Sequence, residues 1–147
     1  MRVTIDTNVI FESLYSSRGS SWAILQSVRR GDVLMAVSVP VFEEYQDVLL
    51  RPDSLRQLKL TDTDARTFLR FLAAVGVPTA TPFRWRPNLQ DEADNMFVEL
   101  AVASGSEYLI TSNTRDFTVN TDLRFDSVRI VSPREFLTEW RKRHGEQ

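Results

Sequence analysis

The stretch Val3-Thr4-Ile5-Asp6-Thr7-Asn8 contains the residues that decide the fold. Its first half is apolar and rich in β-branched residues, which predicts a short buried strand, and a helical pattern begins near Val9. Asp6 therefore falls at the carboxyl end of a strand, where open α/β sheets bind their ligands. A plain alternative is that Asp6 caps the next helix and Asn8 tolerates a tight turn. This stretch alone does not distinguish the two interpretations.

Strand and helix patterns alternate along the rest of the chain. Further strands are predicted at residues 33–37, 108–111 and 128–131, and helices at 20–30, 40–50, 62–75, 91–104 and from Pro133 onward. Such alternation is typical of an α/β fold in which crossover helices join parallel strands. We therefore expect a three-layer α/β/α domain around a twisted, mostly parallel sheet of about four to five strands.

Glycine, proline and capping residues set the predicted boundaries. Gly31 and Gly76 each end a helix, Pro52 terminates the helix at 40–50, and Ser132-Pro133-Arg134-Glu135 has the form of a capping box. Residues 77–89 contain three prolines and are predicted to form an ordered loop or an extended crossover segment.

Composition restricts both the compartment and the chemistry. The 147 residues suit one domain over residues 1–140 with a charged tail at 141–147. Cysteine is absent and His144 is the single histidine, which excludes disulfides and thiolate zinc sites and argues against imidazole catalysis. No stretch has the form of a signal peptide or a membrane span, so we expect a soluble cytoplasmic protein with no membrane partner.

The charge balance allows a nucleic-acid partner. The formal net charge is −2, which by itself argues against phosphate binding, but 16 of the 18 cationic residues are arginine and only Lys59 and Lys142 are lysine. Arginine is suited to bidentate phosphate contacts. An acidic pocket inside a mildly basic surface is therefore compatible with this composition.

Acidic residues recur at the predicted sheet edge. In the helix at 40–50, Glu44 borders the apolar stripe and Glu43 lies opposite it, so Glu44 is the candidate. Asp91 and Asp94 share a face three residues apart, with Asp94 aligned toward the sheet and Asp91 placed to cap the helix. Each acid taken singly also has an ordinary explanation as a cap or a surface residue.

The strand at 108–111 is followed by a run of polar oxygen groups. This run comprises Thr111, Ser112, Asn113 and Asp116. Several carboxylates within a few ångströms repel one another unless a cation is present. Mg²⁺ and Mn²⁺ prefer oxygen ligands and activate water for phosphoryl displacement, so phosphodiester hydrolysis suits this set of residues.

The same motifs resemble those of the PIN-domain ribonucleases, including the VapC-type toxins of toxin-antitoxin pairs. The resemblance rests on residues 3–10 (Val-x-Ile-Asp-Thr-Asn-Val-Ile), Glu43-Glu44-Tyr45, Asp91-x-x-Asp94-Asn95 and residues 109–117. It implies that Asp6, Glu44 and Asp94 are the core metal ligands, with Thr111 and Ser112 beside them. Asn113 departs from the aspartate of many relatives, so a second ion would depend on Asp116, Asp91 or water.

The resemblance also implies a substrate and partners. The family cleaves RNA, and Arg84, Trp85, Arg86 and Arg115 are the expected contacts, since arginine binds phosphate and tryptophan stacks on bases. Trp85 has the alternative role of anchoring its proline-rich loop. Toxins of this type pair with a small antitoxin, and apolar surface at residues 39–75 could serve that contact or a homodimer.

Two other functions remain open. A phosphatase-like domain would use Asp6 as a covalent nucleophile, but enzymes of that type have a second aspartate two residues later, where this chain has Asn8. A binding module that lost catalysis through Asn113 is the other alternative. The leading interpretation is a metal-dependent endoribonuclease in which Asp6, Glu44, Asp94 and Asp116 are catalytic.

Overall fold

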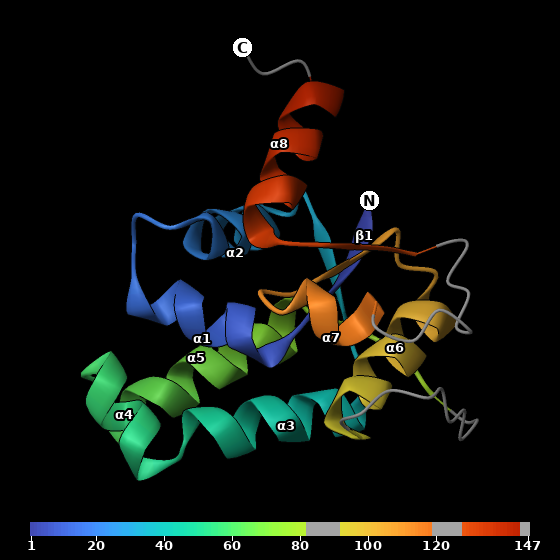
Figure 1. Ribbon diagram of the computed structural model, residues 1–147. Helices are drawn as coiled ribbons and strands as arrows, with labels where there is room; N and C mark the ends of the chain where they lie inside the picture. Colours follow the sequence, from blue (N-terminus) through green and yellow to red (C-terminus); the bar gives the residue numbers. More distant parts are fainter. Residues whose placement is uncertain (82–91, 119–127, 145–147) are drawn as a thin grey trace.

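Five parallel strands form the centre of the molecule, and helices cover both faces of the sheet (Figure 1). The computed structural model describes residues 1–81, 92–118 and 128–144, and for residues 92–94, 116 and 118 it describes the backbone alone. The strands are β1 (Arg2–Ile5), β2 (Leu34–Val37), β3 (Val77–Pro78), β4 (Tyr108–Ile110) and β5 (Arg129–Val131). Their order is β3-β2-β1-β4-β5. The expectation of a parallel α/β/α fold with four to five strands is confirmed.

The described helices connect these strands in sequence. They are α1 (Thr7–Tyr15), α2 (Ser20–Arg30), α3 (Val39–Leu49), α4 (Pro52–Leu58), α5 (Asp62–Val75), α6 (Glu92–Ser104), α7 (Thr114–Thr118) and α8 (Pro133–Arg143). None of the helices within the described ranges has both the length and the apolar character needed to cross a bilayer.

The central strand β1 pairs with β2 on one side and with β4 on the other. Val3 is aligned with Met35 of β2 and with Tyr108 of β4, and Ile5 is aligned with Ile110. Because all three strands run in the same direction, their carboxyl ends lie at one edge of the sheet. Asp6 follows β1 at this edge, and Thr111 follows β4.

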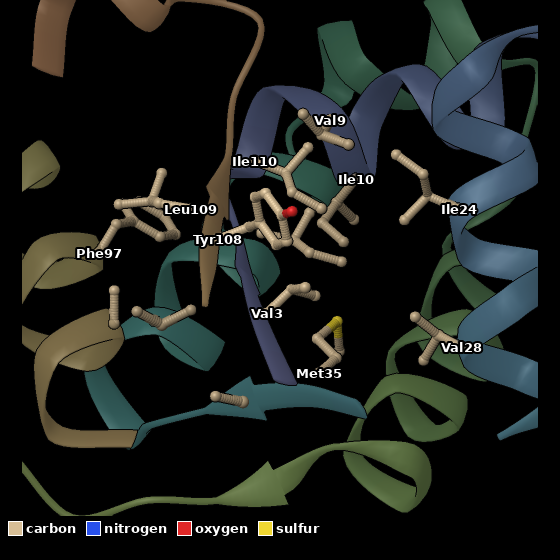
Figure 2. Close-up of a cluster of buried hydrophobic side chains, with 14 of the residues drawn as sticks. Val3, Val9, Ile10, Ile24, Val28, Met35, Phe97, Tyr108, Leu109 and Ile110 are labelled. Carbon is tan, nitrogen blue, oxygen red and sulfur yellow. The ribbon is translucent and has the colours of Figure 1, made fainter. Parts of the chain in front are cut away.

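Apolar side chains on the two sheet faces form the core. Figure 2 shows Ile24 and Val28 of α2 on one side of the strands and Phe97 of α6 on the other, where it lies near Leu109. All four of these side chains are buried. On the α2 side, the ring of Tyr108 meets Phe136 of α8 edge-on at 5.3 Å between centroids. The strands are apolar on both faces because helices cover both.

Three predicted helix boundaries agree with the observed caps, one of which is Gly76 at the end of α5. Gly31 ends α2 in the left-handed region at φ 86°, which glycine adopts without steric cost. Ser132 and Glu135 form the predicted capping box: the Ser132 hydroxyl accepts from the Glu135 amide at 3.1 Å, and the Glu135 carboxylate accepts from the Ser132 amide at 2.8 Å.

Other local predictions were wrong. The first helix begins at Thr7 rather than near Val9, because Asp6 is itself the N-cap. Pro52 does not only end a helix: it lies in the first turn of α4, where its missing amide hydrogen costs nothing. Residues 114–118 form a short helix, α7, which was not among the predicted helices.

The predicted loop at residues 77–89 begins with a strand. Val77–Pro78 forms β3 at the edge of the sheet, with Pro78 opposite Val37 of β2. Proline is tolerated there because an edge strand needs hydrogen bonds on one side only. Residues 82–89 of the predicted loop lie outside the described part of the chain.

Candidate active site

The candidate site lies at the edge of the sheet where β1 and β4 end. The Asp6 amide donates to the Ile110 carbonyl oxygen at 2.9 Å, and the Thr111 amide donates to the Val131 carbonyl oxygen at 2.9 Å. These bonds extend the ladder by one residue beyond each strand. They fix the backbone of Asp6 and Thr111 side by side, although 105 positions separate the two in sequence.

Asp6 is buried and held by two donors. The residue is only 7% exposed to solvent. Oδ1 accepts from the Thr7 amide at 2.7 Å, and Oδ2 accepts from the Thr111 hydroxyl at 2.7 Å. The Thr111 hydroxyl in turn accepts from the Asn113 amide at 3.0 Å, so its own proton is directed at Asp6. Asp6 is therefore both a helix cap and an oriented, partly desolvated carboxylate, and the two initial interpretations are compatible.

Tyr45 connects α3 to the end of β1. The side chain is completely buried, and its hydroxyl donates to the Ile5 carbonyl oxygen, one residue before Asp6. Burial raises the pKa of the Tyr45 phenol, and the negative charge of Asp6 raises it further. The phenol therefore stays neutral and remains a donor. The sequence analysis named Tyr45 only within the Glu43-Glu44-Tyr45 motif and gave it no role in the site; a hydroxyl on a buried aromatic residue next to Glu44 was the available sign of one.

Glu44 and Glu43 have the predicted difference in burial. On α3, Glu44 is half-buried, whereas Glu43 is exposed. The Ser38 hydroxyl caps this helix by accepting from the Val41 amide at 3.3 Å. Because Glu44 directly precedes Tyr45, the contact of Tyr45 with Ile5 fixes the backbone of α3 at Glu44 relative to the end of β1.

The loop after β4 is fastened to α1 by polar contacts. The Ser112 amide donates to Asn8 Oδ1 at 3.2 Å, and the Ser112 hydroxyl donates to Glu12 Oε1 at 2.6 Å. The same Glu12 oxygen accepts from the Ser21 hydroxyl at 3.2 Å. Glu12 and Ser21 were not among the predicted site residues. The spacing of Asn8 and Glu12, four positions apart on one helix, was the sign that could have indicated a shared face.

The remaining predicted residues are placed less completely. The backbone puts Asp94 in the first turn of α6 and Asp116 in α7, but their side chains are outside the described set. The side chains of Asn113 and Arg115 are exposed. The predicted residues Asp91, Arg84, Trp85 and Arg86 lie outside the described residues.

The described side chains suit a hard divalent cation. Asp6, Thr111 and Asn113 all carry side-chain oxygen atoms, the type of ligand that Mg²⁺ and Mn²⁺ prefer. The buried Thr7 Oγ1 and Asn95 Oδ1 have no hydrogen-bond partner among the described residues, and such oxygens are positions that water or an ion can satisfy. No three acidic or histidine side chains converge within the part of the chain whose side chains are described.

Comparison with known proteins decides the family. The family model of the PIN domain matches residues 2–115 of this chain, which include β1, β4 and the start of α7. This chain belongs to the PIN-domain family. The resemblance of its motifs to that family is thereby confirmed. No curated protein matches this PIN domain in a sequence search.

Solved structures agree with the fold. A chain in the structure of VapBC2 from Rickettsia felis, bound to a DNA fragment from their promoter, matches this PIN domain with a TM-score of 0.59 and 13% identity. That match covers 90% of this chain and 98% of the other. A chain in the structure of FitAB bound to an IR36 DNA fragment matches with a TM-score of 0.55 and 20% identity, covering 89% and 94%. At these identities the similarity concerns the fold.

Proposed function

We propose that this PIN domain is an endoribonuclease that hydrolyses RNA phosphodiester bonds with Mg²⁺ or Mn²⁺. The observation that carries the proposal is the Asp6–Thr111 pair: a buried carboxylate held at 2.7 Å by a hydroxyl from the neighbouring strand, at the carboxyl edge of a parallel sheet. This is the position at which α/β sheets bind ligands. Membership of the PIN-domain family supports a nuclease.

The proposed metal ligands are Asp6, Glu44 and Asp94, with Asn113 and Asp116 positioning the ion or its water. When bound, the ion would lower the pKa of a coordinated water and stabilise the leaving oxygen. Thr111 orients the Asp6 carboxylate through its hydroxyl. Because Asn113 is neutral, the proposal requires one ion only.

The chain's own contacts serve this chemistry by limiting motion. Tyr45 ties α3 to the end of β1, and Ser112 ties the loop after β4 to Asn8. Both contacts join elements that contribute proposed ligands, so the ligands need little reorganisation to bind an ion. The contact with Ser112 also gives Asn8 a structural role. A covalent phosphatase would have an aspartate at this position.

RNA is the proposed substrate, and a small antitoxin is a proposed partner. Arg84, Trp85, Arg86 and Arg115 are the candidate RNA contacts. The toxin role is supported by the similarity in fold to chains of VapBC2 and FitAB. On α3, Val39 is 72% exposed, and this apolar surface is available to an antitoxin or a second copy. Cleavage of cellular RNA would place the protein in the cytoplasm.

A cleavage assay tests the function. Wild type, Asp6→Asn and the remote charge control Asp32→Asn are incubated with labelled single-stranded RNA and Mn²⁺, with and without chelator. We expect cleavage by wild type and Asp32→Asn, and loss of cleavage in Asp6→Asn and in every sample with chelator. Asp32 lies after α2 and pairs with Arg30 on the surface, so it matches the charge change only. Equal cleavage in all samples would refute the proposal.

A second candidate is a PIN domain that binds RNA or a protein partner without cutting. The observation that favours it is the neutral, exposed Asn113 at the site edge. Titration calorimetry with Mn²⁺ separates the two candidates. Binding that is lost in Asp6→Asn supports the nuclease, whereas absence of Mn²⁺ binding to the wild type supports the non-catalytic module.

A further inference from the structure

A groove runs along α1 away from Asp6 and is walled by α3 and α4. Its volume is about 830 Å³, within the range of small-molecule sites. We call it the α1 groove; it is lined by Asn8, Phe11, Glu12, Tyr15, Val48 and Gln57. Figure 1 shows α1, α3 and α4 side by side at this end of the molecule, and these helices contact one another.

The groove has an aromatic wall. The rings of Phe11 and Tyr15 are stacked at 6.4 Å between centroids and 19° between planes. Tyr15 is 66% exposed, the highest exposure of any ring among the described large apolar residues. An exposed ring held parallel to a second ring is preorganised to stack on another flat group, because little side-chain freedom remains to be lost.

The groove also contains a fixed acceptor. Glu12 lines it, and both hydroxyl contacts of Glu12, from Ser112 and Ser21, end on Oε1. Within the described residues Oε2 receives no hydrogen bond, so this oxygen is available to a ligand. Gln57 on α4 adds an amide to the same lining. A carboxylate acceptor beside a flat stacking surface is the combination that reads a base with an exocyclic amino group.

Continuity with the Asp6 site identifies the occupant. Asn8 lines the groove and accepts from the Ser112 amide, so the groove opens directly beside the Thr111–Asp6 contact. Tyr15 is nine residues beyond Asp6 along α1, about 14 Å at 1.5 Å per residue. A nucleotide that places its phosphate at Asp6 therefore has a neighbour within reach of the stacked rings.

We infer that the α1 groove is a nucleobase subsite that receives a base with an exocyclic amino group (cytosine, adenine or guanine) next to the scissile phosphate, with Tyr15 as the stacking surface and Glu12 as the acceptor for that amino group. The inference rests on the proposed function for its substrate class. Uracil carries a carbonyl oxygen where cytosine carries the amino group. The Glu12 carboxylate cannot accept a hydrogen bond from that carbonyl, so it selects against uracil.

Binding, rather than cleavage, tests this inference. The affinities of fluorescently labelled oligo(rC), oligo(rA) and oligo(rU) are measured by anisotropy in the presence of a chelator, with RNA integrity checked on a gel. The proteins are wild type, Tyr15→Ala, Tyr15→Phe, Glu12→Gln and Asp32→Asn, each compared by its melting temperature. Tyr15→Phe keeps the ring and its packing, and Glu12→Gln keeps an oxygen that accepts from Ser112.

We expect wild type to bind oligo(rC) and oligo(rA) more tightly than oligo(rU). Tyr15→Ala should lose about 5- to 150-fold in affinity for the preferred oligomers, the range for one base–aromatic stack, and Tyr15→Phe and Asp32→Asn should bind like wild type. Glu12→Gln should reduce the preference over oligo(rU), because an amide can donate to the uracil carbonyl.

Either of two results overturns the inference. The first is unchanged RNA affinity in Tyr15→Ala, even if that variant binds a protein partner less tightly. The second is an unchanged order of affinities for the three oligomers in Glu12→Gln. Failure of the proposed function gives a different pattern. Base-selective binding that the variants alter, without cleavage in Mn²⁺, refutes the nuclease and supports the groove. Chelator-sensitive cleavage with no effect of the groove variants supports the nuclease and refutes the groove.

Discussion

Replacing Tyr45 with phenylalanine removes one hydroxyl from the interior and should reveal how α3 is fixed to β1. The ring remains in place, packed beside Phe97 at 6.3 Å between centroids. The lost group is the donor to the Ile5 carbonyl oxygen. Since Tyr45 is completely buried, water cannot replace that donor without rearrangement.

The cost near neutral pH follows from the acceptor that is left behind. Removing one partner of a buried hydrogen bond destabilises a protein by about 1–3 kcal/mol. We therefore expect the free energy of unfolding of Tyr45→Phe to be lower than that of wild type by about this amount. The variant should also bind Mn²⁺ less tightly, because the backbone of α3 at Glu44 loses the adjacent contact that fixes it relative to the end of β1.

The difference should shrink at high pH. Burial raises the pKa of Tyr45 in the folded state, whereas in the unfolded chain the phenol titrates near pH 10. Above that pH the unfolded state loses the proton that the folded state retains, so stability falls as pH rises. Between about pH 9 and about pH 11 this group costs wild type about 1 kcal/mol. Tyr45→Phe lacks this phenol, so its free energy of unfolding does not fall for this reason.

Urea unfolding of both proteins between neutral pH and about pH 11 measures this difference. The remaining tyrosines and all carboxylates are common to the two proteins, so their titration cancels in the comparison. A stability difference that stays constant across this range would refute the assignment of Tyr45 as a buried neutral donor. Equal stability near neutral pH would refute a stabilising bond to Ile5.

Three further substitutions probe separate contacts. Thr111→Val removes the hydroxyl that donates to Asp6, so unfolding free energy should fall by about 1–3 kcal/mol and Mn²⁺ affinity should fall in calorimetry; unchanged affinity would contradict the orienting role. Gly76→Ala places a Cβ 2.5 Å from Val37 Cγ2 and should cost about 1–3 kcal/mol in urea unfolding, and a more stable variant would exclude this clash. Ser132→Ala removes the cap of α8 and should cost about 1 kcal/mol, visible as a lower melting temperature; no shift would show that the cap contributes little.

Local sequence patterns correctly predicted a buried strand and the caps at two helix ends. The run at residues 3–5 indicated a buried strand, and the capping box at Ser132 and the stop at Gly31 depend on side chains and backbone within a few residues. These features are readable because the interacting groups are neighbours in sequence. The helix α4 was missed because Pro52 is compatible with both the end of one helix and the first turn of the next.

The placement of two candidate residues was predictable from the sequence, but their contacts were not. The sequence alone determined that Asp6 follows a strand and that Glu44, rather than Glu43, borders a buried face. Only the tertiary structure decided that Thr111 donates to Asp6 and that Tyr45 donates to Ile5, 40 residues away. The physical reason is that strand order in a sheet is a long-range property: β1 and β4 become neighbours through packing of the helices between them, and no local pattern encodes that choice.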